Sequence, residues 1–184
     1  MARKIKGKDW YNILAPKIFE EKVLGETPAD DVKKVINRTL EVPLVLLTND
    51  MGKYYVKAKM KIVKVENQNA YTELFGLECM RDYIARMIRH RVTRIDTVQK
   101  LETKDGKKIV IKSIIVTNKR VTAGVESKIK KFVEEFIAKT VSENTLDEIV
   151  TKILKDVIKQ KILKDGSKIY PLKFFEIRKL EVKI

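Results

Sequence analysis

The spacing of apolar residues changes along the chain, and this change constrains the fold more than any other feature. In residues 54–66 apolar side chains alternate with lysines, which is the spacing of a half-buried strand. In residues 124–141 and 146–163 they recur every three or four positions, which is typical of helices with one buried stripe. The final segment, residues 168–184, returns to a strand pattern. Strands that precede and follow helices in this way predict one α+β body.

The rest of the chain fills in this pattern. Strands are predicted at 35–47, 70–78, 91–103 and 108–119, a short helix at 79–89, loops or turns at 25–31, 49–53, 67–69 and 104–107, and a change of phase near 62–63. Asp105-Gly106 is a favoured two-residue hairpin turn, in which both residues need a positive φ. Thr145 and Glu148 form a capping-box signature at the start of the second long helix. Asp165-Gly166 should end that helix, and the final strand should pair with an earlier one and close the sheet.

The charge of the chain points to an anionic partner. Its 184 residues include 40 Lys and Arg against 25 Asp and Glu, for a net charge of +15. The excess is spread evenly, because residues 1–94 hold 19 bases and 12 acids and residues 95–184 hold 21 and 13. A folded body with cations on several sides suggests a polyanion that surrounds it. The alternative is a lysine-rich surface that only keeps the protein soluble.

Several classes of function find no support in the sequence. Cys79 and His90 are the only residues of their kinds, so neither an intrachain disulfide nor a zinc site without carboxylates is possible. No phosphate-binding loop or dinucleotide motif occurs, and a catalytic triad would have to use His90 among arginines. The first residues lack the apolar segment of a secretory signal, and the longest uncharged run, residues 42–49, is too short to cross a membrane. We therefore expect no catalytic residue, metal or cofactor, although a nuclease that uses carboxylates alone stays open.

Arginine is concentrated in one short segment. Residues 86–94 contain four of the nine arginines, together with His90 and no acid. An arginine side chain grips phosphate with a planar fork, whereas lysine is a point charge. Arg81, Arg86, Arg89, His90, Arg91 and Arg94 are therefore candidates for phosphate contact. The alternative is a solvated helix face.

A second basic segment lies at the start of the chain. The first nine residues carry cations without periodicity and predict an extended arm, and Trp10 and Tyr11 would anchor it.

Five segments together resemble a known family. They are residues 8–19 (KDWYNILAPKIF), 73–89 (ELFGLECMRDYIARMIR), the KDGKK hairpin at 104–108, 146–154 (LDEIVTKIL) and 167–182 (SKIYPLKFFEIRKLEV). In this order they are similar to the S-three-A-e family of small-subunit ribosomal proteins, also called the eukaryotic-type S-one protein. The short arm, and an end soon after the IYPL strand, make the chain look like an archaeal member.

The resemblance implies a fold and a role. The fold would be α+β: a β-barrel of about six or seven mainly antiparallel strands flanked by helices. Residues 1–24 would be the basic arm and its anchor, and residues 25–184 a single domain with a helical layer at about 124–163. The role would be structural, on the platform of the small ribosomal subunit near the messenger exit, in the cytoplasm and without catalysis. The expected partners are the 3′ region of small-subunit ribosomal RNA, neighbouring ribosomal proteins and, as a further candidate, messenger RNA; no membrane is expected.

The residues expected to contact RNA combine the charge pattern with the resemblance. They are Arg3, Lys4, Lys6, Lys8, Trp10, Tyr11, Lys17, Arg81, Arg86, Arg89, His90, Arg91, Arg94, Lys119, Arg120, Arg178 and Lys179. The sequence alone leaves two other classes open. One is a free-standing nucleic-acid chaperone or metal-dependent nuclease, and the other is an adaptor that binds an acidic protein through its helices.

Overall fold

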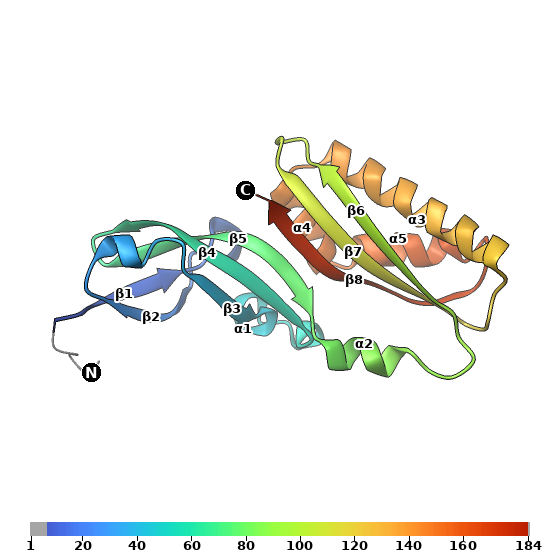
Figure 1. Ribbon diagram of the computed structural model, residues 1–184, viewed down its shortest axis with the longest axis horizontal. Coiled ribbons are helices and arrows are strands. Elements are labelled where there is room, and N and C mark those ends of the chain that lie inside the picture. Colours follow the sequence, from blue (N-terminus) through green and yellow to red (C-terminus); the bar gives the residue numbers. More distant parts are fainter. Residues whose placement is uncertain (1–6, 184) are drawn as a thin grey trace. The chain divides into compact units, whose positions relative to one another are not determined.

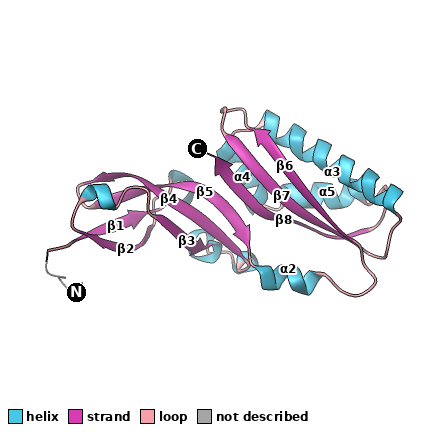
Figure 2. Ribbon diagram, in the orientation of Figure 1, coloured by secondary structure: helices cyan, strands magenta, loops and turns pink. Residues whose placement is uncertain are grey.

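The computed structural model describes residues 7–183 and divides the chain into two compact units, one ending at Leu77 and the other beginning at Glu78. Arg3, Lys4 and Lys6 of the predicted arm lie outside the described residues. Both units combine strands with helices, which Figure 1 labels and Figure 2 colours by type.

The first unit is built on five strands in the order β2-β1-β5-β4-β3. The strands are β1 (Asp9–Leu14), β2 (Val23–Ala29), β3 (Thr39–Pro43), β4 (Val56–Glu66) and β5 (Asn69–Cys79). Helix α1 (Leu44–Thr48) and the 3₁₀ segments η1 (Lys17–Phe19), η2 (Val32–Lys34) and η3 (Met51–Lys53) lie between them. Asn67 and Gln68 both have positive φ and form the turn between β4 and β5, as the sequence predicted. The core contains buried Tyr11, Val35 and Ile62.

The second unit places three helices on one face of three antiparallel strands (Figure 1). The elements are α2 (Arg81–Met87), β6 (Arg94–Glu102), β7 (Lys108–Thr117), α3 (Ala123–Glu143), α4 (Leu146–Leu154), α5 (Val157–Gly166) and β8 (Leu172–Lys183). The buried stripe of α3 includes Ile129, Val133 and Ile137. Gln99 of β6 donates a hydrogen bond of 2.8 Å to the carbonyl of Glu134 on α3, so the odd-numbered residues of β6 face the helices.

The strands are antiparallel in most pairs, but the predicted closed barrel is wrong. Eight strands are present among residues 7–183, and β2, β3 and β6 each have an open edge there. A barrel needs its outer strands to pair with each other. Pro28 in β2 and Pro43 at the end of β3 lack a backbone N–H, which suits edge strands.

Two segments of the first unit differ from their predicted structure. Residues 25–31, predicted as a loop, largely belong to β2, because this stretch pairs antiparallel with β1 from Asp9 to Ile13. Residues 35–47, predicted as one strand, divide into β3 and α1. Their β-branched composition is also compatible with a short helix, so composition alone did not decide between the two.

The helical region also differs in one respect. The predicted helix at 146–163 is divided into α4 and α5, because Asp156 has a left-handed φ of 55°. The predicted capping box is confirmed: Thr145 Oγ1 accepts from the Glu148 N–H, and the Glu148 carboxylate accepts from the Thr145 N–H. Gly166 is the last residue of α5 rather than the residue beyond it.

The β6–β7 hairpin is confirmed, but its turn is not the predicted one. Only Gly106 has a positive φ there, and the loop closes through a hydrogen bond of 3.0 Å from the Thr103 N–H to the Lys107 carbonyl. The Asp105 carboxylate instead accepts a hydrogen bond of 3.1 Å from the Leu146 N–H at the start of α4. The turn thus helps to position the helical layer.

Candidate nucleic-acid interface

Helix α2 is shorter than the predicted helix at 79–89. Ile84 and Met87 are buried on one side of it, whereas Arg81 and Arg86 are exposed. The helix ends at Met87 because Ile88 adopts extended backbone angles. Arg91 has a φ of 66° and lies in the following loop, not in the predicted strand. The arginine-rich segment is therefore a helix, a loop and the first residue of β6.

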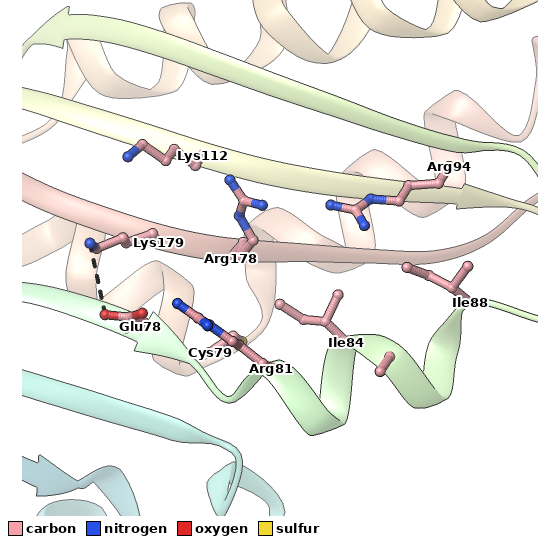
Figure 3. Close-up of a pocket in the computed structure, with 10 residues that line it drawn as sticks. Glu78, Cys79, Arg81, Ile84, Ile88, Arg94, Lys112, Arg178 and Lys179 are labelled. Carbon is pink, nitrogen blue, oxygen red and sulfur yellow. Dashed lines mark ion pairs between the residues drawn. The ribbon is translucent and has the colours of Figure 1, made fainter.

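A groove of about 520 Å³ lies in the second unit beside α2. Its lining comes from five elements, namely the end of β5 and parts of α2, β6, β7 and β8: Glu78, Cys79, Arg81, Ile84, Ala85, Ile88, Arg94, Lys112, Arg178 and Lys179. Figure 3 shows the Arg94 side chain extending toward Arg178, the Arg178 side chain extending from β8 toward β7, and the Arg81 side chain extending from α2 toward Glu78. Arg94 is an even-numbered residue of β6, so the groove is on the face opposite α3.

Arg178 enters this groove because of an irregularity in β8. Lys112 pairs with Lys179, but the next residue of β7, Ser113, pairs with Ile177. Arg178 is thus an extra residue in β8, which is the definition of a β-bulge. A bulge re-aims side chains, and here Arg178 and Lys179 line the same groove.

The cations of the groove fall into two groups. Arg94 makes a two-point contact with Asp96, with Nε 2.9 Å from Oδ2 and Nη2 3.1 Å from Oδ1. Lys112 and Lys179 both contact carboxylates. Arg81 and Arg178, in contrast, have no ion pair with any acid among residues 7–183. Their guanidinium groups keep their full hydrogen-bonding capacity for a ligand.

Glu181 is the acid that balances the two lysines. Its carboxylate lies 3.3 Å from Lys112 Nζ and 2.6 Å from Lys179 Nζ. The hydrogen bond from Lys179 lowers the pKa of the Glu181 carboxyl, partial burial opposes this, and Lys112 lowers the pKa further. Lys179 Nζ also lies 3.9 Å from Glu78. These lysines are therefore partly neutralised within the protein.

A second group of exposed cations gathers at one end of β6 and β7. The Thr93 N–H donates to Thr117 Oγ1 over 3.1 Å, and the Thr117 N–H donates to the Thr93 carbonyl over 3.0 Å. The Val121 N–H also donates to Thr93 Oγ1 over 3.1 Å. These bonds hold two loops together, and we call their exposed basic side chains the loop cluster: Arg89, His90, Arg91, Lys119 and Arg120.

The first unit carries the remaining described candidates. Lys8 and Lys17 are exposed, and Trp10 is half-buried on β1. Tyr11 is only 7% exposed and belongs to the core of this unit, so its ring cannot stack on a base. These residues belong to the first unit, whereas the groove and the loop cluster belong to the second.

Lys112 is the one groove cation that the sequence analysis missed. It is the one charged residue between Ile109 and Val116 in a strand that is otherwise largely buried. A lone lysine inside such an apolar run was a usable signal. The apolar wall made by Ile84, Ala85 and Ile88 was not predictable in the same way, because only the packing of α2 creates it.

Two other kinds of feature are not found among residues 7–183. No group of three or more His, Cys, Asp or Glu side chains in this range could hold a metal ion. No helix in the same range is long and apolar enough to cross a membrane. The arrangement that remains is a set of arginines and lysines suited to phosphate.

Comparison with known proteins adds independent information. The sequence profile of the Ribosomal S3Ae family matches residues 2–183. A protein of Methanopyrus kandleri named small ribosomal subunit protein eS1 is 38% identical over 183 residues, which cover 97% of this chain and 87% of that protein. A protein of the same name from Saccharolobus islandicus (strain L.S.2.15) is 36% identical over 179 residues, which cover 97% of this chain and 86% of the relative. Both organisms are archaea, in keeping with the archaeal character expected from the sequence.

Proposed function

Because the chain belongs to the ribosomal S3Ae family, we propose that it is a structural constituent of the small ribosomal subunit. In this proposal it binds ribosomal RNA on the platform, near the exit of the messenger channel, and supports subunit assembly and translation. The observation that carries the proposal is the family match, which covers residues 2–183. The protein then works in the ribosome, in the cytoplasm, as a structural component rather than an enzyme.

The distribution of charge supports RNA as the main partner. The net charge of +15 suits a protein that lies among phosphates, since each Lys or Arg that neutralises a phosphate releases counterions. The groove and the loop cluster supply arginines from segments nearly 100 residues apart in sequence, from Arg81 to Arg178. We assign both to RNA contact. Neighbouring ribosomal proteins are further partners, and messenger RNA near the exit is another.

The first unit contributes in a different way. Lys8 and Lys17 are exposed and suit phosphate contact, and Trp10 remains the hinge of the proposed arm with Arg3, Lys4 and Lys6. Tyr11 would anchor this hinge from inside the core rather than touch RNA.

A competition assay tests the proposal. Wild-type protein and the Arg86→Ala/Arg89→Ala variant are mixed in equal amounts with small subunits that lack the protein, and incorporation is measured. The variant should be incorporated less well, because both arginines are exposed and free to meet phosphate. Lys128→Ala/Lys131→Ala, on the exposed side of α3, removes the same charge and serves as the matched control.

Two results would count against the proposal. Failure of the wild-type protein itself to enter small subunits would contradict the structural role. Crosslinks from the groove or loop cluster to RNA far from the 3′ region of small-subunit RNA would contradict the placement on the platform.

A further inference from the structure

We infer that the groove beside α2 holds one unstacked RNA nucleotide, with its phosphate bound by Arg81 and Arg178 and its base and ribose against the wall of Ile84, Ala85 and Ile88. The inference rests on the proposed function, and it specifies which part of an RNA the groove takes. A nucleotide held in this way would mark a bulge, a loop or a strand end rather than a duplex.

The charge of the groove favours a phosphate at Arg81 and Arg178. Arg94 is engaged by Asp96, and Lys112 and Lys179 are engaged by carboxylates. No acid among residues 7–183 pairs with Arg81 or Arg178. A phosphate can therefore bind these two guanidinium groups without breaking an ion pair, and the arginine fork offers two parallel N–H donors to it.

The size and lining of the groove favour a nucleotide over a lone phosphate. A volume of about 520 Å³ falls within the range of pockets that bury small organic ligands. One side is apolar: Ile84 is buried, Ile88 is half-buried, and Ala85 is exposed. A lone phosphate gains nothing from contact with an apolar wall. The flat face of a base, in contrast, can bury apolar surface against it, and the ribose can pack beside it. A duplex is too wide for such a space.

The two walls of the groove are held together, so the site is preorganised. Tyr83 of α2 donates its hydroxyl to Glu176 of β8 over 3.4 Å. Lys159 of α5 also donates to Glu176. Arg81 and Arg178 thus project from two elements, α2 and β8, that are tied through one buried carboxylate. Ligand binding therefore has to order the Arg81 and Arg178 side chains but not the backbone elements that carry them.

An acidic peptide is the competing ligand, and the lining fits it less well. A peptide would bring carboxylates but no flat ring for the apolar wall. It would also bring backbone N–H and C=O groups that need partners. Five of the ten lining side chains are cationic and only Glu78 is acidic, and arginine planes are surfaces on which unpaired bases stack.

The test uses the full-length protein and a fluorescent single-stranded RNA hexanucleotide at low salt. Binding is followed by anisotropy, and each variant is checked by circular dichroism and thermal unfolding. Arg81→Ala/Arg178→Ala should bind about tenfold more weakly, because two charge-assisted contacts are lost. Ala85→Glu places an acid on an exposed position of the wall and should have a similar effect. Lys128→Ala/Lys131→Ala loses the same charge elsewhere and should bind within about twofold of wild type.

Two further probes separate the ligands. A hexanucleotide with abasic sites should bind more weakly than the normal RNA, and a short polyglutamate peptide should not displace the RNA. Equal binding of the abasic RNA would overturn the base contact, and displacement by the peptide would assign the groove to an acidic protein. Wild-type affinity in both groove variants would overturn the inference as a whole.

Incorporation of the same proteins into small subunits distinguishes this inference from the proposed function. If wild type is incorporated but the groove variants bind the hexanucleotide normally, only the groove inference fails. If the hexanucleotide binds in the groove but wild type is not incorporated, the proposed function fails and the groove remains a nucleotide site.

Discussion

Lys112 on β7 and Lys179 on β8 lie directly opposite each other in the register of the sheet. Like charges in opposite positions repel. Glu181 compensates, since its two carboxylate oxygens lie 3.3 Å and 2.6 Å from the two ammonium nitrogens. One acid thus bridges two lysines at the side of the groove.

Glu181→Gln should destabilise the protein by about 0.5 kcal/mol at pH 7, a value reduced for solvent exposure. The pKa of Glu181 is lowered in the folded state, so its contribution is present above the ordinary carboxyl pKa. It is lost as the pH falls through the lower folded pKa. Urea unfolding at pH 7 and pH 2 should therefore show a smaller difference between variant and wild type at pH 2. A difference as large at pH 2 as at pH 7 would contradict this account.

Arg81→Ala/Arg178→Ala should also change the salt dependence of RNA binding. Each lost phosphate contact on single-stranded RNA reduces the slope of log K against log salt by about 0.7. Titrations at several salt concentrations should therefore give a slope that is shallower by about 1.4. Arg178→Lys retains the charge and should keep the wild-type slope while losing affinity, because only the guanidinium fork is removed.

Thr145→Ala should cost about 1 kcal/mol of stability, because it removes the hydroxyl that caps α4. Thr122 provides a matched control. It occupies the same N-cap position in α3 but makes no capping hydrogen bond through its side chain. Thr122→Ala should therefore change the free energy of unfolding by much less. Equal losses in the two variants, measured by urea unfolding, would show that the capping box contributes nothing specific.

Gly166→Ala should destabilise the protein by about 1 kcal/mol, the lower end of the cost of overpacking, because the half-buried Leu172 side chain has to move. A Cβ atom at this position would lie 2.5 Å from Leu172 Cδ1 and 3.5 Å from Phe132 Cε1. Gly124→Ala is the control, because a Cβ there would have no neighbour within 4 Å. Alanine favours helix more than glycine does, so this control should be neutral or slightly stabilised. A stabilised Gly166→Ala variant in thermal unfolding would contradict the close contact.

The two compact units should unfold in one transition, as the prediction of a single domain over residues 25–184 requires. The boundary between them, at Leu77, falls inside the continuous strand β5. Trp10 fluorescence reports on the first unit, and circular dichroism at 222 nm reports mainly on the helices of the second. The two signals should have the same midpoint in urea. Separate midpoints would establish two domains.

Local patterns in the sequence were sufficient for much of the secondary structure. The alternation in residues 54–66 predicted β4, the three-and-four spacing predicted α3, and Thr145 with Glu148 predicted the cap of α4. Each of these signals depends only on residues within one strand or one helix. Each can therefore be recognised in the sequence without knowing which strand or helix packs against it. The division of α4 from α5 at Asp156 was missed because apolar spacing continues across the break.

The sequence by itself determined the α+β class, the surplus of positive charge and most of the phosphate-binding candidates. Tertiary structure alone decided that the strands have open edges, that Tyr11 is buried and that Arg81, Lys112 and Arg178 line one groove. The reason is that strand register and bulges depend on pairing between residues far apart in the chain. The shift beside Lys112 moves Arg178 into place, and no pattern within β8 alone specifies that shift.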